Sequence, residues 1–112
     1  MGGESSRMDV LRGTLDLLVL RTLATGPRHG LGISRRIEEI TRGTFEVTPG
    51  SLFPALRRLE DRGFVRGEWG ESETKRKARF YSLTKAGKGR LVEERRVWQQ
   101  VLVAVGRVLE EA

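Results

Sequence analysis

The chain has 112 residues, of which 38% are hydrophobic, 32% charged and 6% aromatic, and this length supports one domain with a modest core that self-association would stabilise. It has no cysteine and a single histidine, His29, which excludes a disulfide scaffold and a cysteine nucleophile and leaves little for a histidine-based site. The 21 Lys and Arg residues exceed the 15 Asp and Glu residues to give a net charge of +6, which indicates a polyanionic partner, most often nucleic acid.

The start of the chain is small and polar, so residues 1–8 are predicted to be a disordered lead-in without a signal peptide. The longest purely apolar run covers only 17–20, whereas a membrane span needs about 20 residues. We therefore expect no membrane partner and a cytoplasmic location.

A first helix is predicted from Asp9, a plausible N-cap, to the break at Gly26 and Pro27. Its main apolar residues recur at helical spacing, and they are Leu11, Leu15, Leu18 and Leu23. Further apolar residues widen this stripe. A stripe this wide predicts two contacts, one with the core of the domain and one with another partner.

A turn over 29–32 is predicted to lead into a short second helix, in which Ile33, Ile37 and Ile40 share one face. The basic pair Arg35 and Arg36 stands between them. His29 stands at the entry of this helix, where a ring nitrogen can satisfy a backbone group. We expect that structural role for His29 rather than metal ligation or catalysis, because no second histidine or cysteine exists to share a metal.

A third helix is predicted to start at Thr48, which can cap free N–H groups, and Pro49, which needs no donor at the first helical position. Its buried stripe is Leu52, Leu56 and Leu59. Pro54 deletes a backbone hydrogen bond in the second turn and is expected to bend the helix. Gly63 is the expected C-cap.

Strand-like residues over 64–69 and 78–83 predict a hairpin whose tip, over 70–77, is long, polar and mobile. Trp69 is expected to pack beside the core. Thr84 is expected to cap a last helix that runs to about residue 109, with Arg95 on its heptad seam. The apolar seam positions are Leu91, Trp98, Leu102, Val105 and Leu109.

Helices followed by a hairpin predict a mainly α fold with a small β-hairpin, namely a winged helix-turn-helix over 9–84. Residues 85–112 are then a C-terminal dimerisation helix. The domain is too small to cover the seam of this helix, so a two-fold dimer is expected to bury it. The predicted dimer contacts are Leu11, Leu15, Leu18, Leu91, Trp98, Leu102, Val105 and Leu109.

In a winged helix-turn-helix, the third helix presents a polar side to the DNA major groove. Gly50 and Ser51 are small enough here to let the helix start approach the bases. The basic hairpin tip can lie on the phosphate backbone or reach into the minor groove, although a short basic run taken alone is usually only solvated surface. The predicted DNA contacts are Arg35, Arg36, Thr48, Gly50, Ser51, Phe53, Pro54, Arg57, Arg58, Lys75, Arg76, Lys77 and Arg79.

The sequence offers no case for an enzyme. Adjacent carboxylates such as Glu60 and Asp61 lie on predicted helix surfaces, where neighbours in sequence do not face each other. No phosphate loop, nucleotide fingerprint or nucleophile elbow occurs. We therefore expect no catalytic residue, no cofactor and no metal.

Four stretches in this order resemble the PadR-like transcriptional regulators: LRGTLDLL at 11–18, HGLGI at 29–33, GSLFPALRRLE at 50–60 and FYSLTKAG at 80–87. The segment EWGESE at 68–73, with 76–81 after it, is similar to the branch called acidobacterial PadR. The resemblance implies a dimeric DNA-binding regulator, usually a repressor, whose C-terminal helix is the dimer arm.

Two positions depart from the pattern of the family. Phe53 and Leu31 stand where members commonly have tyrosine, so any contact made by the Phe53-position hydroxyl in relatives is absent here. Some members bind aromatic molecules between the two chains, near an aromatic residue of the last helix, and Trp98 resembles that residue. The residues leave two roles open for Trp98, namely packing in the dimer seam or lining a pocket for a small aromatic effector.

The leading hypothesis is a dimeric regulator that binds double-stranded DNA at a palindromic operator. The alternative is a winged-helix module that binds another protein and does not read DNA, because fold alone does not fix function. DNA binding predicts that the two arginine pairs at 35–36 and 57–58 and the basic hairpin tip converge on one face.

Overall fold

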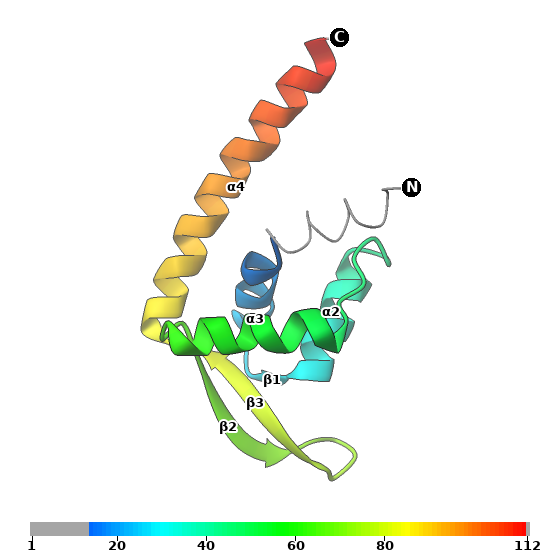
Figure 1. Cartoon of the computed structure of the whole chain (residues 1–112), viewed down its shortest axis with the longest axis vertical. Coiled ribbons are helices and arrows are strands. Elements are labelled where there is room, and N and C mark those ends of the chain that lie inside the picture. Colours follow the sequence, from blue (N-terminus) through cyan, green and yellow to red (C-terminus); the bar gives the residue numbers. More distant parts are fainter. Residues whose placement is uncertain (1–13, 112) are drawn as a thin grey trace.

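The computed structural model of the chain describes residues 14–111, which form helices and a small antiparallel sheet (Figure 1). A helical segment over 14–23 is followed by β1 (Arg28–His29), α2 (Gly30–Ile40), α3 (Pro49–Asp61), β2 (Val65–Glu71), β3 (Lys77–Leu83) and α4 (Lys85–Glu111). The predicted fold class, mainly helical with a hairpin and a long last helix, is confirmed. The lead-in over 1–8, the expected cap Asp9 and the expected dimer contact Leu11 lie outside the described residues.

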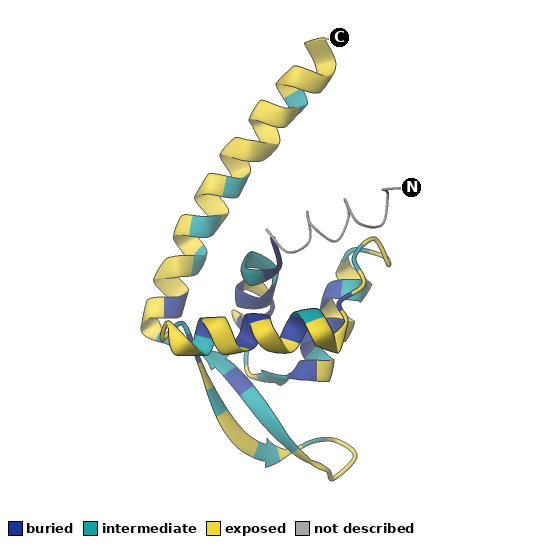
Figure 2. Cartoon of the chain, in the orientation of Figure 1, coloured by how far each residue is buried: buried dark blue, intermediate teal, exposed yellow. Residues whose placement is uncertain are grey.

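The core lies where segment 14–23, α2 and α3 pack together above the base of the hairpin, and Figure 2 shows these buried positions in dark blue. The predicted leucine stripe of α3 is buried in it, together with Ile33 and Ile37 of α2. Leu15 is only 2% exposed and belongs to this same core. The expectation that Leu15 contacts a second chain is therefore wrong, because its side chain is already fully covered.

The predicted turn over 29–32 is instead a short strand that runs directly into a helix. β1 pairs with β3, with His29 opposite Phe80, so the sheet has three strands in the order β1-β3-β2. The Nδ1 atom of His29 accepts a hydrogen bond from the backbone N–H of Gly32 at 3.1 Å. This bond confirms the structural role expected of His29, because it satisfies a free N–H at the start of α2.

The third predicted helix forms, but its start differs from the expectation. Pro49 occupies the first turn, whereas the Thr48 side chain makes no capping bond to the backbone. Its hydroxyl donates to the Ser51 hydroxyl at 3.4 Å instead. Arg62 is the cap residue of α3, and Gly63 follows it with a φ of +81°, which glycine adopts without strain, so the predicted glycine stop lies one residue beyond the cap.

The strands of the hairpin pair over a longer range than the sequence predicts, and only residues 72–76 connect them. We call β2, β3 and these connecting residues the wing. Its tip is closed by a hydrogen bond of 2.9 Å from the Ser72 N–H to the Arg76 carbonyl. Trp69 is 62% exposed, so the expectation that it packs beside the core is wrong. Val65 is buried at the base of the same strand face, whereas Trp69 stands further along it, where the wing has left the core.

Thr84 joins the wing to the last helix. Its hydroxyl accepts the Gly87 N–H at 3.0 Å, which confirms the predicted cap, and donates to the Gly63 carbonyl at 2.6 Å. Gly87 lies against the backbone of Phe64, where a β-carbon would have no space. From there α4 extends away from the domain for 27 residues, about 40 Å at the helical rise, with most of its surface exposed (Figures 1 and 2).

Candidate nucleic-acid interface

The exposed side of α3 is narrow and lies opposite its buried stripe. At 100° per residue, the exposed residues Gly50, Pro54, Arg57 and Asp61 fall within an arc of about 60° and form a narrow strip along the helix. Gly50 and Pro54 carry little bulk, so the backbone at the start of this strip is accessible. Arg57 is the one cation at its centre, as a base-reading side chain would be.

The two flanks of α3 face different neighbours. On one flank, the Arg58 guanidinium donates to the Asp16 carboxylate of segment 14–23 at 2.9 Å. On the other flank, the Glu60 carboxylate accepts a bond from Arg79 of β3 at 2.5 Å. Arg57 therefore stands between two ion pairs that hold α3 to the rest of the domain.

The bond between Arg79 and Glu60 ties the wing to α3. Gly67 lies beside it on β2, and a β-carbon on Gly67 would stand only 2.8 Å from the Arg79 Nη2 atom. The Tyr81 ring lies on the same strand face, with its centroid 5.9 Å from the guanidinium carbon. Arg79 was expected to contact DNA, and in the structure its side chain is 36% exposed and its charge is paired with Glu60.

Sequence reasoning missed Glu60 and Gly67 as parts of this arrangement. Glu60 and Arg79 are 19 residues apart, so no local periodicity connects them. The one available signal was Gly67 in the middle of a strand, which often marks the close approach of another group.

The two basic residues of α2, Arg35 and Arg36, line one hollow beside the wing but differ in their other neighbours. Arg35 lines a groove between the wing and the N-terminal ends of α2 and α3, together with Arg76, Lys77 and Phe53. Arg36 lies 3.7 Å from the Glu39 carboxylate. Arg35 and the basic residues of the wing therefore lie on one groove, as expected. Arg36 and Arg58 are instead paired with carboxylates.

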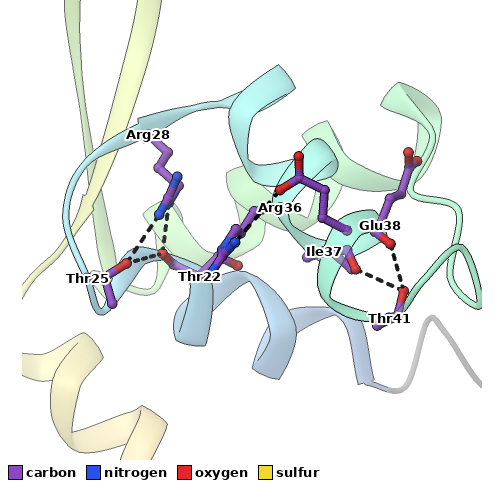
Figure 3. Close-up of polar contacts among 8 residues, drawn as sticks. Thr22, Thr25, Arg28, Arg36, Ile37, Glu38 and Thr41 are labelled. Carbon is purple, nitrogen blue, oxygen red and sulfur yellow. Dashed lines mark hydrogen bonds and ion pairs between the residues drawn. The ribbon is translucent and has the colours of Figure 1, made fainter.

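Polar contacts follow the end of segment 14–23, where the chain turns toward β1, and Figure 3 shows them. The Arg28 guanidinium donates to the Thr22 carbonyl at 3.2 Å and to the Thr25 hydroxyl at 3.3 Å. These bonds hold the chain where it turns into β1 and α2. The same view shows the ion pair of Arg36 with a neighbouring carboxylate on α2.

The wing carries its cations at and beside the tip. Lys75, Arg76 and Lys77 are all exposed, and Lys75 adopts a φ of +61° in the turn. The Lys77 Nζ atom lies 5.6 Å from the centre of the Trp69 ring, a cation–π distance. The tip is thus an exposed basic end with one large aromatic side chain next to it.

Most of the predicted dimer seam projects beyond the domain. Leu18 and Leu91 are partly buried and pack against the core of their own domain. Leu102, Val105 and Leu109 are 64%, 50% and 72% exposed, and Trp98 is half-buried. Val101 and Val108, which are not among the predicted seam positions, extend the same stripe by helical geometry and are also exposed.

Within residues 14–111, no group of His, Cys, Asp and Glu side chains could hold a metal ion. No helix in this part of the chain combines the length and apolar character of a membrane span.

Comparison with known proteins shows the family. A sequence model of the transcriptional regulator PadR-like family matches residues 19–93. The transcriptional regulator Rv3488 of Mycobacterium tuberculosis is 32% identical over 90 residues, which cover 80% of each chain. The members of such a family are transcriptional regulators and not enzymes.

Solved structures agree with the sequence comparison. A transcriptional regulator from Clostridium thermocellum, Cth-833, is 27% identical and superposes with a TM-score of 0.80, over 88% of this chain and 96% of the other. A PadR family regulator from Eggerthella lenta is 28% identical with a TM-score of 0.80, over 97% and 93% of the two chains.

Proposed function

The chain belongs to the PadR-like family of transcriptional regulators, and from that premise we propose that it is a dimeric, sequence-specific DNA-binding repressor of the cytoplasm. In this proposal α3 reads the major groove of double-stranded DNA, and the wing binds the phosphate backbone or the minor groove. Assignment to the acidobacterial branch stays a prediction that rests on residues 68–73.

The observation that carries the proposal is the shared placement of α3 and the wing. The exposed strip of α3 bears Arg57, and the ion pair between Arg79 and Glu60 holds the basic wing beside it. A narrow helix face and a cationic arm in fixed relation suit a duplex, whose major groove is about 12 Å wide and whose phosphates lie on either side.

We assign different tasks to the two elements. Ser51 and Arg57 contact base edges, because a hydroxyl and a guanidinium can discriminate the patterns of donors and acceptors in the major groove. Thr48, Gly50, Phe53 and Pro54 bring the helix start close to the duplex. Lys75, Arg76 and Lys77 neutralise phosphates and so supply affinity for any sequence.

Dimerisation through α4 completes the proposal. The seam from Trp98 to Leu109 exposes large apolar side chains, and a monomer rarely leaves such a surface uncovered. A two-fold dimer would present two copies of α3 to a palindromic operator. If the two chains leave a cavity at Trp98, a small aromatic effector is the ligand that an indole ring would stack against.

Selection of genomic fragments by the purified protein, followed by sequencing, tests this function directly. The expected result is an enriched motif with two-fold symmetry. Uniform recovery of fragments together with capture of a specific protein would instead support an interaction module. For Trp98, fluorescence is titrated with planar aromatic compounds in a Trp69→Phe background, where saturable quenching supports a pocket and no response supports packing.

A further inference from the structure

Three large apolar side chains are exposed in the groove between the wing and the N-terminal ends of α2 and α3. Leu31 is 55% exposed, Phe53 50% and Trp69 62%, and all three line this one hollow of about 730 Å³, which we call the wing groove. Neither base reading by α3 nor phosphate binding by the wing tip requires apolar residues there. Large exposed apolar side chains that gather in one groove indicate a contact surface.

The register of the wing turns Trp69 toward α3. Trp69 is paired with Arg79, so the two side chains lie on the same face of the wing. Arg79 bonds to Glu60 of α3, and that face therefore looks toward α3 and the wing groove. The cation–π contact with Lys77 holds the indole ring at this position while leaving most of it exposed.

The charges around the wing groove fit an anionic partner. Arg35, Arg76 and Lys77 contribute positive charge to its lining, and Glu73 is the carboxylate among the lining residues. Arg79 also lines it, although its charge is paired with Glu60. Apolar side chains surrounded by cations match a chain in which apolar sugars alternate with phosphates.

We propose that the wing groove binds the deoxyribose–phosphate backbone of one strand of duplex DNA. Trp69 and Phe53 contact the C–H faces of successive sugars, and Arg35, Arg76 and Lys77 bind the phosphates that flank them. This proposal rests on the proposed DNA-binding function and adds to it an apolar contact that reads no bases. Trp69 is its central residue.

The proposal makes Trp69 and Lys77 differ in one measurable respect. Replacing Trp69 with alanine removes apolar contact but no charge, so affinity for duplex DNA falls about fivefold to tenfold while the salt dependence is unchanged. Replacing Lys77 with glutamine removes one phosphate contact per chain and two per dimer, so the slope of log affinity against log salt becomes smaller in magnitude by about 1.8. Both losses are the same on unrelated sequences, because the contacts are to the backbone.

The experiment measures binding of a random-sequence 30-base-pair duplex to full-length protein in a Trp98→Phe background. Trp69 is then the only tryptophan, and its fluorescence reports directly on the wing groove. We expect the duplex to shift this emission and shield the ring from acrylamide in proportion to occupancy. We expect Trp69→Phe to retain most of the affinity and Trp69→Ala to show the fivefold to tenfold fall. Val92→Ala is the matched control, because Val92 is an exposed apolar residue on α4, away from the wing groove.

Two results would overturn the proposal while leaving the proposed function standing. One is duplex binding with unchanged Trp69 emission and unchanged affinity in Trp69→Ala. The other is a change in the oligomeric state of Trp69→Ala with no change in affinity, which would make the groove a contact between copies of this chain. If the Trp98→Phe protein and the wild type both fail to bind any duplex at low salt, the DNA-binding function itself fails.

Discussion

Arg79 of the wing and Glu60 of α3 are joined by an ion pair of 2.5 Å, and this bond links the two elements that we propose to contact DNA. An exposed ion pair adds little to folding stability. Its consequence here is geometric, because we expect it to hold the wing at one distance and angle from α3. Contacts in two grooves of the same duplex depend on that relation.

The first prediction follows from this bond. Glu60→Gln makes the protein more cationic, so electrostatics alone would strengthen all DNA binding. We expect the preference for the selected operator over random DNA to fall about threefold to tenfold instead, because the wing loses its fixed position. Competition binding with the two duplexes measures this ratio. The exchanged pair Glu60→Arg with Arg79→Glu is expected to restore part of it, and an unchanged ratio in Glu60→Gln would contradict the positioning role.

Gly67→Ala provides an independent approach to the same bond. The new methyl group would collide with the Arg79 guanidinium and move it away from Glu60. Because the displaced group is the end of a flexible side chain, we expect little change in the melting temperature but the same loss of operator preference. Gly67→Ala combined with Glu60→Gln should lose no more than either change alone. Additive losses would mean that the two residues act separately.

Arg57 and Lys75 are expected to contribute different kinds of binding energy. Arg57→Ala should relax the preference at one base pair, at a cost of about 1–3 kcal/mol for the preferred base. Lys75→Ala should weaken all sequences alike and reduce the magnitude of the salt slope by about two units, because each chain of the dimer loses one phosphate contact. Selection of binding sites with each variant measures the first effect, and salt titration measures the second. Identical behaviour of the two variants would contradict the division of tasks.

The α4 seam yields a prediction about assembly. Each aliphatic side chain buried there contributes about 1.5–3 kcal/mol, so Leu102→Asp should produce monomers and abolish operator binding. Val103→Asp is the matched control, because Val103 is similarly exposed but lies beside Gln99, Gln100 and Arg107, away from the seam. Analytical ultracentrifugation distinguishes the two variants. A dimeric Leu102→Asp protein would show that the seam is not the interface.

Much of this fold follows from residues close together in sequence. Leucine spacing predicts the helices and their buried faces, and the caps at His29 and Thr84 and the glycine stop at Gly63 are local features that the structure confirms. The strand β1 has only two residues and exists because β3 pairs with it, so no periodicity could reveal it. The local sequence pattern also could not show that the Leu15 side chain is fully buried in the core of its own chain.

The candidate interface is harder to predict from sequence than the fold, because more of it depends on contacts between residues that are distant in sequence. The basic wing tip and the exposed strip of α3 are predictable from sequence, because charge and helical spacing are local properties. The engagement of Arg79 by Glu60 and of Arg58 by Asp16 is not, since each pair joins separate elements. The exposure of Trp69 was missed because strand alternation identifies a face but not the point where a hairpin leaves the core.

Salt titration of duplex binding tests the central proposal most directly. If each dimer neutralises about six phosphates, log affinity for the selected operator should fall linearly with log salt with a slope of roughly −5. The slope on random DNA should be similar, with lower affinity throughout. A flat response to salt would contradict the proposal that this chain binds DNA through α3 and its basic wing.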